Sequence, residues 1–295
     1  MISMVSPILV NIIGAGKMGK TIGKLLVQTT AARILAVHNR TQVSSIEAIN
    51  FIGDGAYYSH LSELPPATIT IIGTPDDHIA SICHQLNNHA HLMPKSIVMH
   101  LSGALTSDVL EPVKKQNCYI LSAHPMCSFA IPALAVNQYP GTYCAIEGDA
   151  TAVKTISELF QLFGSLTCKI HKDKKALYHA SGVFAANYLV TIAEYALQCL
   201  NLVQDNSETN IAIIINLMRK VITNLETTSS PAQALTGPIQ RGDLETIKKH
   251  LTILPNATQK RLYAELSLAT LPLTSLTEIQ KTQIQHWLLK YMNIN

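Results

Sequence analysis

The sequence predicts an α/β fold in which a mostly parallel, doubly wound sheet precedes an all-helical domain. Short apolar runs alternate with helical patterns through the first half of the 295-residue chain, as expected for a sheet with helices on both faces. A glycine-rich turn joins the first apolar run to the first helical pattern. Beyond residue 149 the strand pattern almost ends and long helical patterns follow. We therefore expect two domains, at residues 1–149 and 150–295.

The individual elements follow from the spacing of apolar residues and from the turn residues between them. Strands of the first domain are expected at 8–13, 34–38, 68–73, 96–101, 118–123 and 142–147. Helical or loop patterns between them cover 20–30, 43–52, 76–88 and 106–116. In the second domain a short strand pattern at 166–170 precedes helices at 175–203, 207–227, 243–253, 257–270 and 275–292.

Composition restricts the kind of protein that this chain can be. With 47% apolar and 14% charged residues, it can form sizeable cores and is unlike a disordered chain. A net charge of +3 without a basic run argues against a nucleic-acid partner. Six singly placed cysteines and the absence of a basic leader predict a cytoplasmic protein with free thiols and no membrane anchor. The histidines and cysteines show no metal-ligand spacing.

The glycine-rich turn has the spacing of a dinucleotide-binding motif. An apolar run ends in Gly14-Ala15-Gly16-Lys17-Met18-Gly19, and a helical pattern follows. Gly14 would permit the tight turn, Gly16 would let phosphates approach the backbone, and Gly19 would let helix and strand pack closely. The pyrophosphate would bind at the helix N-terminus, where the helix dipole favours anions. We expect Lys17 and Met18 to take part in this site.

The end of the second strand predicts which dinucleotide binds. An NAD site normally has a carboxylate there for the ribose hydroxyls, whereas this chain has Asn39, Arg40 and Thr41. No carboxylate would repel a 2′-phosphate, and the Arg40 guanidinium can pair with one. The segment therefore predicts NADP(H); the alternative is that Arg40 is a solvated loop residue.

Three later strands also end in turn residues. These loops are candidates for the cofactor and substrate cleft, because ligands of such sheets bind outside the carboxyl ends of the strands. A histidine at a strand end can orient a carbonyl or carboxylate, or it can simply bond to the backbone. We expect cofactor contacts at Gly73, Thr74, Pro75, Ser102 and Gly103, and a substrate contact at His124.

The helix that begins at Lys175 has one polar side, which carries His179 and Asn187. This side must face either water or a wet cleft. Both residues lie just after the crossover from the nucleotide domain, which favours a cleft. The alternative is a solvent-exposed face, or a core histidine satisfied by one hydrogen bond.

A second polar segment, Ser229 to Asp243, lies between apolar helices. Thr236, Arg241 and Asp243 are its candidate site residues, since an arginine suits a substrate carboxylate. The alternative for Asp243 is an N-cap of the next helix. For Arg241 the alternative is simple surface exposure.

Taken together, these motifs resemble a known group of bacterial Rossmann-like proteins with a helical C-terminal domain. That group belongs to the superfamily of pyrroline-5-carboxylate reductase, ketopantoate reductase and the 6-phosphogluconate and β-hydroxyacid dehydrogenases, and includes an alternative ketopantoate reductase group. The resemblance covers GAGKMG, the NRT strand end, GTPDDHI, HLSGAL, SAHPM, YHASGVFAANYL and ALTGPIQRGD, within residues 8–255.

The resemblance departs from the better-known ketopantoate reductases in the first helix of the second domain. Those enzymes have an early lysine followed by two asparagines, whereas the comparable positions here are His179, Val183 and Asn187. Lys174 or Lys175 can supply a cation, but both precede this helix face. Pyrroline-5-carboxylate reductases have Ser and Gly residues early in this helix, and Ser181-Gly182 matches that pattern only loosely.

These observations predict an NADPH-dependent reductase of a small 2-oxo acid, with 2-dehydropantoate as the best single substrate. His179 would donate the proton, because its ordinary pKa lies near neutrality. Asn187 would orient the substrate, while Thr236, Arg241 and Asp243 would shape its pocket. The alternatives are a pyrroline-5-carboxylate or other imine reductase, a non-catalytic NADP(H) sensor, and a 3-hydroxyacid dehydrogenase. The very apolar helix at 207–227 predicts a homodimer.

Overall fold

The computed structural model describes residues 7–292. The chain forms two compact units, Met1–Ala186 and Asn187–Asn295. The predicted boundary at 149/150 lies earlier than this division. The reason is that β8 (Leu166–Lys169) adds the last strand to the sheet of the first unit, and α5 (Ala150–Gln161) packs into the core of that unit.

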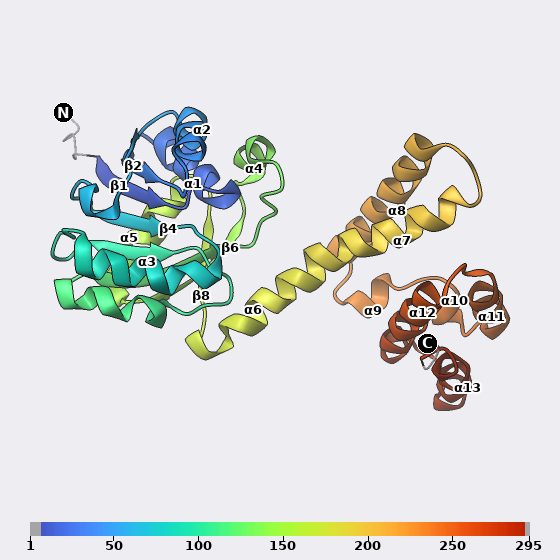
Figure 1. The fold of residues 1–295 in the computed structure, drawn as a ribbon. Helices are drawn as coiled ribbons and strands as arrows, with labels where there is room; N and C mark the ends of the chain where they lie inside the picture. Colours follow the sequence, from blue (N-terminus) through green and yellow to red (C-terminus); the bar gives the residue numbers. More distant parts are fainter. Residues whose placement is uncertain (1–6, 293–295) are drawn as a thin grey trace. The chain divides into compact units, whose positions relative to one another are not determined.

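The first unit is built on an eight-stranded sheet of order β3-β2-β1-β4-β5-β6-β7-β8 (Figure 1). All neighbouring strands are parallel except β6 and β7, which pair antiparallel. The predicted α/β class, with a mostly parallel sheet, is therefore confirmed. The remaining strands are β1 (Ile8–Ile13), β2 (Ala32–His38), β3 (Ala56–Tyr57), β4 (Ile69–Ile72), β5 (Ile97–His100), β6 (Tyr119–Pro125) and β7 (Tyr143–Gly148).

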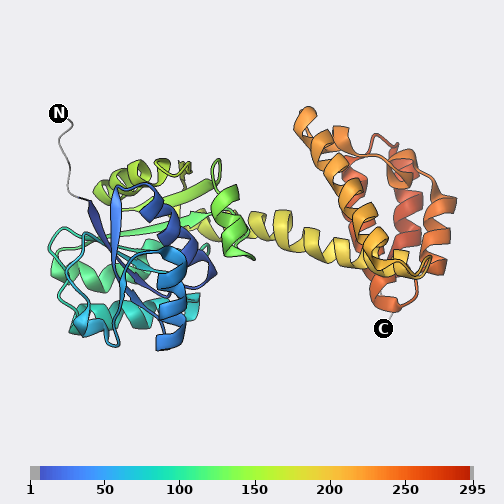
Figure 2. The same cartoon turned by 90° about the horizontal axis from the view of Figure 1, so that it is seen from above.

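Helices cover both faces of this sheet (Figure 2), because successive strand residues point to opposite sides. On β1, Ile12 packs into one hydrophobic cluster and Ile13 into the other, and both are buried. The first cluster includes residues of α1 (Lys17–Gln28), α2 (Gln42–Ile52), α4 (Pro132–Gln138) and α5. The second includes residues of α3 (Asp76–His89), η1 (Leu61–Glu63) and η2 (Ser107–Gln116).

Several local features add to the sequence prediction. The segment expected as helix or loop at 106–116 is a 3₁₀ helix that contains Pro112, which has no N–H to donate within an α-helix. The helices α4 and α5 and the short strand β3 were not predicted. In α5 the buried residues Val153, Ile156 and Phe160 recur at helical spacing.

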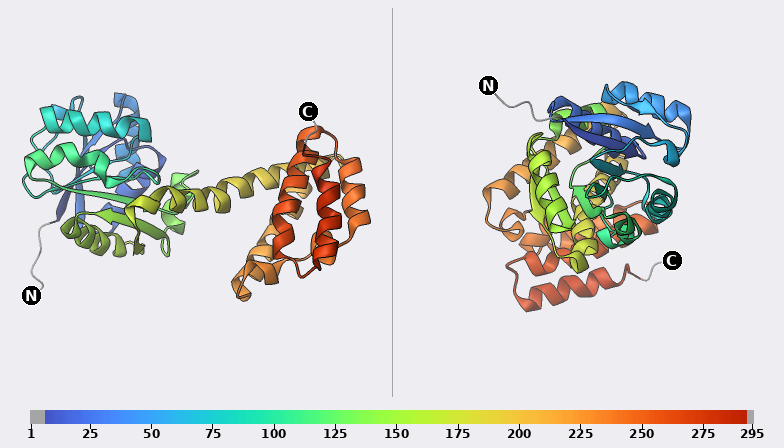
Figure 3. Two further views of the ribbon diagram at one scale, coloured as in Figure 1. Left: turned by 90° about the horizontal axis from the view of Figure 1, so that it is seen from below. Right: turned by 90° about the vertical axis from the view of Figure 1, so that its left-hand side faces the viewer.

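The second unit is entirely helical among its described residues. Its core includes Ile247, Leu251, Ala264, Ile284 and Leu288, and the helices that carry them are drawn in orange to red in Figure 3. The predicted long helices match the observed ones closely. These are α7 (Tyr188–Asn201), α8 (Ser207–Thr227), α11 (Leu244–Ile253), α12 (Ala257–Thr270) and α13 (Glu278–Leu289), with short α9 (Pro231–Ala234), α10 (Pro238–Arg241) and η5 (Leu271–Leu273).

One continuous helical stretch, Lys172–Asn201, passes from the first unit into the second. It contains η3 (Lys172–Lys174), α6 (Lys175–Gly182), a π-helical turn (Val183–Asn187) and α7. Its length and composition alone would permit it to cross a membrane. This is weak evidence, because its first turns carry Lys175 and His179, which contact the sheet of the first unit.

Candidate functional site

The glycine turn has the geometry that the sequence predicts for its three glycines. Gly14 has φ +83°, and a Cβ there would lie 2.6 Å from the Thr74 backbone nitrogen, so a side chain would separate the ends of β1 and β4. A Cβ at Gly19 would lie 2.6 Å from the Gly14 carbonyl oxygen. A Cβ at Gly16 would meet no atom within 4 Å, so the backbone there is open to an approaching ligand.

The N-terminus of α1 is free to receive an anion. Gly16 occupies the N-cap position without a side-chain hydrogen bond, and the first turn holds no acidic residue. The backbone N–H groups of a first helical turn lack intrahelical partners. Together with the helix dipole, they form a site suited to phosphate.

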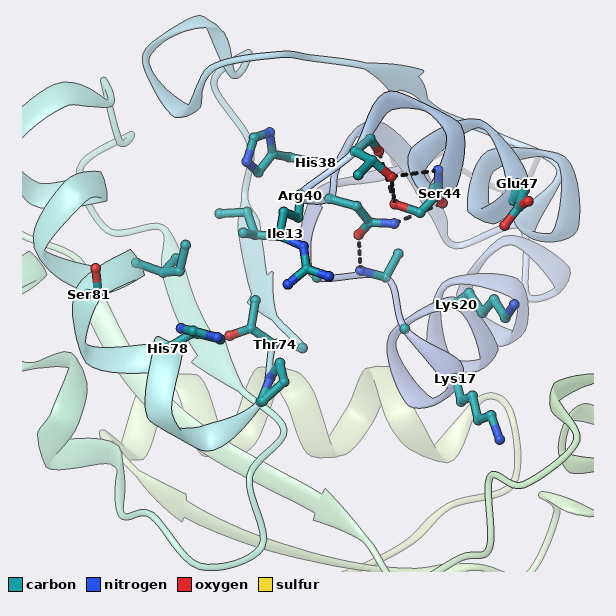
Figure 4. Close-up of a pocket in the computed structure, with 18 of the residues that line it drawn as sticks. Ile13, Lys17, Lys20, His38, Arg40, Ser44, Glu47, Thr74, His78 and Ser81 are labelled. Carbon is teal, nitrogen blue, oxygen red and sulfur yellow. Dashed lines mark hydrogen bonds between the residues drawn. The ribbon is translucent and has the colours of Figure 1, made fainter.

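A cavity of about 740 Å³ opens beside this helix end (Figure 4). It lies where the carboxyl ends of β1 and β4 meet, the point at which the strand order reverses. Ligands bind at such switch points in open α/β sheets. Among the residues predicted to hold a cofactor, those lining the cavity are Gly14, Gly16, Lys17, Asn39, Arg40, Thr41, Gly73, Thr74 and Pro75.

The side chains at the cavity suit an anionic ligand. Arg40 lines it and forms no ion pair with any described residue. In Figure 4 its side chain extends towards Thr74 and His78, while Glu47 projects from α2 farther away. The Thr74 hydroxyl is buried at the cavity wall and has no hydrogen-bond partner among residues 7–292.

Asn39 shapes the loop rather than offering a free side chain. Its Oδ1 accepts a hydrogen bond from the Ala15 N–H at 2.6 Å, and its Nδ2 donates to the Ser44 carbonyl at 2.9 Å. Thr41 likewise caps α2, where its hydroxyl accepts from the Ser44 N–H. Both residues therefore hold the Arg40 loop in place.

Four residues predicted to contact the cofactor do not line this cavity: Met18, Gly19, Ser102 and Gly103. Met18 packs against the hydrophobic core, and Gly19 packs against the Gly14 carbonyl. The Ser102 hydroxyl is already engaged, since it donates to Asp76 at the start of α3 at 2.8 Å and accepts from the Leu105 N–H in its own loop at 2.9 Å.

A second group of polar residues gathers at the ends of β5 and β6. The His124 Nδ1 lies 2.9 Å from the Leu101 carbonyl oxygen, so Nδ1 carries the hydrogen and Nε2 is an acceptor. The rings of His124 and His179 meet edge to face, with centroids 5.3 Å apart. A Cβ at Gly103 would lie 2.8 Å from His124 Nε2 and 2.3 Å from His179 Nδ1. Gly103 thus leaves room for both imidazoles.

The surroundings of His124 favour its neutral form. Burial lowers its pKa, and electrostatic interactions with His179 and Lys175 lower it further, whereas its bond to the Leu101 carbonyl opposes the shift. A neutral imidazole of fixed tautomer can accept a hydrogen bond or orient a partner. His179 is only partly buried, so its ring can contact a ligand or solvent.

The sequence prediction missed a charged pair beneath these histidines. Lys175 is 1% exposed; its Nζ donates to the Ser122 hydroxyl and lies 3.5 Å from Glu147 Oε1. The Ser107 N–H and hydroxyl each donate to Glu147 at 2.7 Å. Burial lowers the pKa of Lys175 to about 8, although Glu147 favours the charged form.

The same network fixes His100. Its Nε2 lies 3.1 Å from the Thr106 carbonyl oxygen, and its Nδ1 accepts from the Ser102 N–H at 3.2 Å. Burial, assisted by the charge of Lys175, lowers the pKa of His100 to about 3. His100 is therefore a neutral structural residue, which supports the loop that carries Gly103.

Replacing Gly103 by alanine is expected to lower kcat about 100-fold, because a displacement of about 1 Å in reacting groups can cost that much. The new methyl group would overlap His179 Nδ1 and His124 Nε2. NADPH binding should change little, since Gly103 is not part of the cavity. Steady-state kinetics and an NADPH titration check this, with Ala104→Ser at the exposed neighbouring position as the control. Unchanged kcat in Gly103→Ala would contradict the assignment of this histidine pair.

The other predicted site residues, Asn187, Thr236, Arg241 and Asp243, belong to the second unit. Asn187 and Thr236 are exposed, as is Arg241 in the last turn of α10. Asp243 is the N-cap of α11, and its carboxylate accepts from the Thr246 N–H at 3.1 Å and hydroxyl at 2.7 Å. These bonds lower the pKa of Asp243. The structure thus shows the capping role that was the alternative for Asp243, and its catalytic role stays a prediction.

Comparison with protein families gives two matching regions, and the second begins within the first compact unit. Residues 4–125 match the model of a Rossmann-like domain. Residues 142–270 match the model of a domain of unknown function, DUF2520. A comparison with curated protein sequences gives no match.

Several solved structures share the fold over most of the chain. A proposed NADP oxidoreductase from Bacteroides fragilis has a TM-score of 0.74 at 20% identity, covering 90% of this chain and 98% of that one. The imine reductase from Myxococcus stipitatus in complex with NADP⁺ has a TM-score of 0.62 at 12% identity, covering 90% and 94%. The 1-pyrroline-5-carboxylate reductase from Streptococcus pyogenes has a TM-score of 0.59 at 17% identity, covering 98% and 99%. At these identities the likeness shows the fold.

Proposed function

We propose that this protein is an NADP(H)-dependent oxidoreductase that binds its cofactor in the cavity beside α1. The observation that carries this proposal is the coincidence of three features at one switch point: an open Gly16 backbone, an uncapped helix N-terminus and the unpaired Arg40. The pyrophosphate would be held by the first turn of α1, and Arg40 would pair with the 2′-phosphate. The NADP oxidoreductase and imine reductase structures of the same fold support this assignment.

We further propose that the reaction is the reduction of a small 2-oxo acid, with 2-dehydropantoate as the best single substrate. Bound NADPH supplies a hydride, so the protein must position the carbonyl group and provide a proton for the developing alkoxide. His179 is the proton donor in this proposal, and neutral His124 orients it or the substrate. His124 lies near the carboxyl end of β6, and His179 contacts it there from α6. Ligands of such sheets bind at the carboxyl ends of the strands.

The test is NADPH oxidation followed by absorbance with 2-dehydropantoate, pyrroline-5-carboxylate and several branched 2-oxo acids. The proposal expects the highest kcat/KM with 2-dehydropantoate. Turnover of pyrroline-5-carboxylate alone would replace the 2-oxo acid assignment by imine reduction. Tight NADPH binding without turnover of any substrate would instead support a nucleotide-sensing protein.

Imine reduction is the second candidate because of the charge state of His124. A protonated imine needs no strong acid for hydride addition, and burial lowers the pKa of His124, which makes it a weaker source of a proton. Structures named as an imine reductase and a pyrroline-5-carboxylate reductase share the fold. The role of His179 separates the two candidates, since a carbonyl requires a proton donor and a protonated imine does not.

We also propose that the chain forms a homodimer through α8. Ile213, Leu217 and Val221 lie four residues apart on this helix, and all three are exposed, Leu217 by 62%. A continuous apolar stripe of this kind is typical of a protein interface. Sedimentation at micromolar concentration should therefore give a dimer, and Leu217→Glu should dissociate it. A wild-type monomer under these conditions would contradict the proposal.

A further inference from the structure

The side chain of Lys175 is buried although it is charged. Lysine is almost never fully buried unless it is paired. Here the ammonium group contacts Ser122 on β6 and Glu147 on β7, so the first turn of α6 is tied to the two antiparallel strands of the sheet. Glu147 keeps its own hydrogen bonds to Ser107, which satisfy both carboxylate oxygens.

The position of Lys175 on α6 relates it directly to the histidine pair. His179 lies four residues later, and residues at this spacing share one face of a helix. That face meets β6 at both points, because Lys175 bonds to Ser122 while His179 contacts His124, two residues further along the same strand. Tyr178 adds a third contact, from its hydroxyl to the His124 carbonyl at 3.4 Å.

We propose that Lys175 is a positioning residue, whose buried ammonium group anchors α6 so that His179 is held against His124 beside Gly103. This inference rests on the proposed function, since it names the device that aligns the proton donor. Lys175 has no free path to a ligand, because it is 1% exposed. It therefore acts through His179 and not on the substrate.

The energetic reason for a charge at this place is directional bonding. An apolar side chain could fill the same volume at similar or lower cost, because burying two charges requires desolvation that their attraction barely repays. An ammonium group, by contrast, fixes the helix in register through bonds to named atoms on two strands. The pKa of Lys175 is lowered to about 8, mainly because burial removes water from its ammonium group.

The test uses the double variant Lys175→Met with Glu147→Gln, which removes both charges without leaving one of them unpaired. The matched control is Lys174→Met, because Lys174 is the neighbouring lysine and its side chain is 66% exposed. In the double variant kcat should fall about 10- to 100-fold, as expected for a misplaced reacting group. The affinity for NADPH should stay close to that of the wild type, and the control should keep wild-type kcat.

A double-mutant cycle separates positioning from general structural damage. Adding His179→Ala to the double variant should cause little further loss, because residues that act as a unit are not additive. Fully multiplicative losses, or an unchanged kcat in the double variant, would overturn the proposal. If the double variant does not fold, Ser122→Ala is used in its place, because it removes one hydrogen-bond partner of Lys175. Its loss in kcat should be smaller, and adding His179→Ala should again cause little further loss. Multiplicative losses in kcat for Ser122→Ala and His179→Ala would equally overturn the proposal.

A second readout does not depend on turnover. In protein labelled with ¹⁵N-histidine, the ring signals of His124 and His179 should shift in the double variant and remain in place in Lys174→Met. Unmoved ring signals in the double variant would overturn the positioning role. Shifted signals in a protein that turns over no substrate would instead support the positioning geometry while the proposed function fails.

Discussion

Arg40→Asp is expected to raise the KM for NADPH about 100-fold or more while changing that for NADH by much less. The substitution removes a charge-assisted hydrogen bond, worth about 1.5–3 kcal/mol, and places a carboxylate beside the 2′-phosphate. Each 1.4 kcal/mol corresponds to about tenfold in affinity. Arg40 suits this test because it lines the cavity and has no protein carboxylate as an ion-pair partner among the described residues.

The matched control for this prediction is Arg33→Asp, the same charge change on β2. The Arg33 side chain is 62% exposed, pairs with Asp54 and lies outside the cavity. Arg33→Asp should leave the KM for NADPH and the KM for NADH near those of the wild type. Equal losses for NADPH and NADH in Arg40→Asp would show that Arg40 does not recognise the 2′-phosphate.

The second large effect is expected from His179→Gln, which should lower kcat on a 2-oxo acid about 100- to 1,000-fold. General acid catalysis contributes about 10²- to 10⁴-fold, and glutamine keeps a hydrogen-bonding side chain but cannot deliver a proton at neutral pH. With an imine that is already protonated, the same variant should keep most of its activity. Parallel assays on 2-dehydropantoate and pyrroline-5-carboxylate measure this difference.

His171→Gln supplies the control, because His171 is an exposed residue at the start of η3. It should retain wild-type kcat on both substrates. If His179→Gln is also fully active on 2-dehydropantoate, the donor lies elsewhere. Because burial lowers the pKa of His124, His124 is then a poor substitute as an acid at neutral pH.

The parts of the fold that were predictable from sequence are those encoded locally. The strands and long helices have clear apolar periods. In the glycine turn, Gly14 itself indicates a positive φ, which the structure has. The helix α4, by contrast, has seven residues, which is too short for a reliable period. The antiparallel direction of β7 depends on how the chain returns after β6, and no local pattern encodes it.

The site was predictable where backbone geometry defines it, and less so where partners come from distant segments. Lys175 precedes the polar helix face in sequence, and only its four-residue spacing to His179 indicates that both lie on one side of the helix. Its partner Glu147 is 28 residues away and carries no motif. Asp243 shows the opposite case, because the structure confirms the capping alternative that its sequence position suggested.

The central claim is that NADP(H) occupies the cavity between the ends of β1 and β4. A crystal structure of the protein with NADPH tests it most directly. The account predicts the pyrophosphate against the N–H groups that follow Gly16, and the 2′-phosphate within hydrogen-bonding distance of Arg40. A cavity left empty at saturating NADPH, or a cofactor bound elsewhere on the chain, would contradict it.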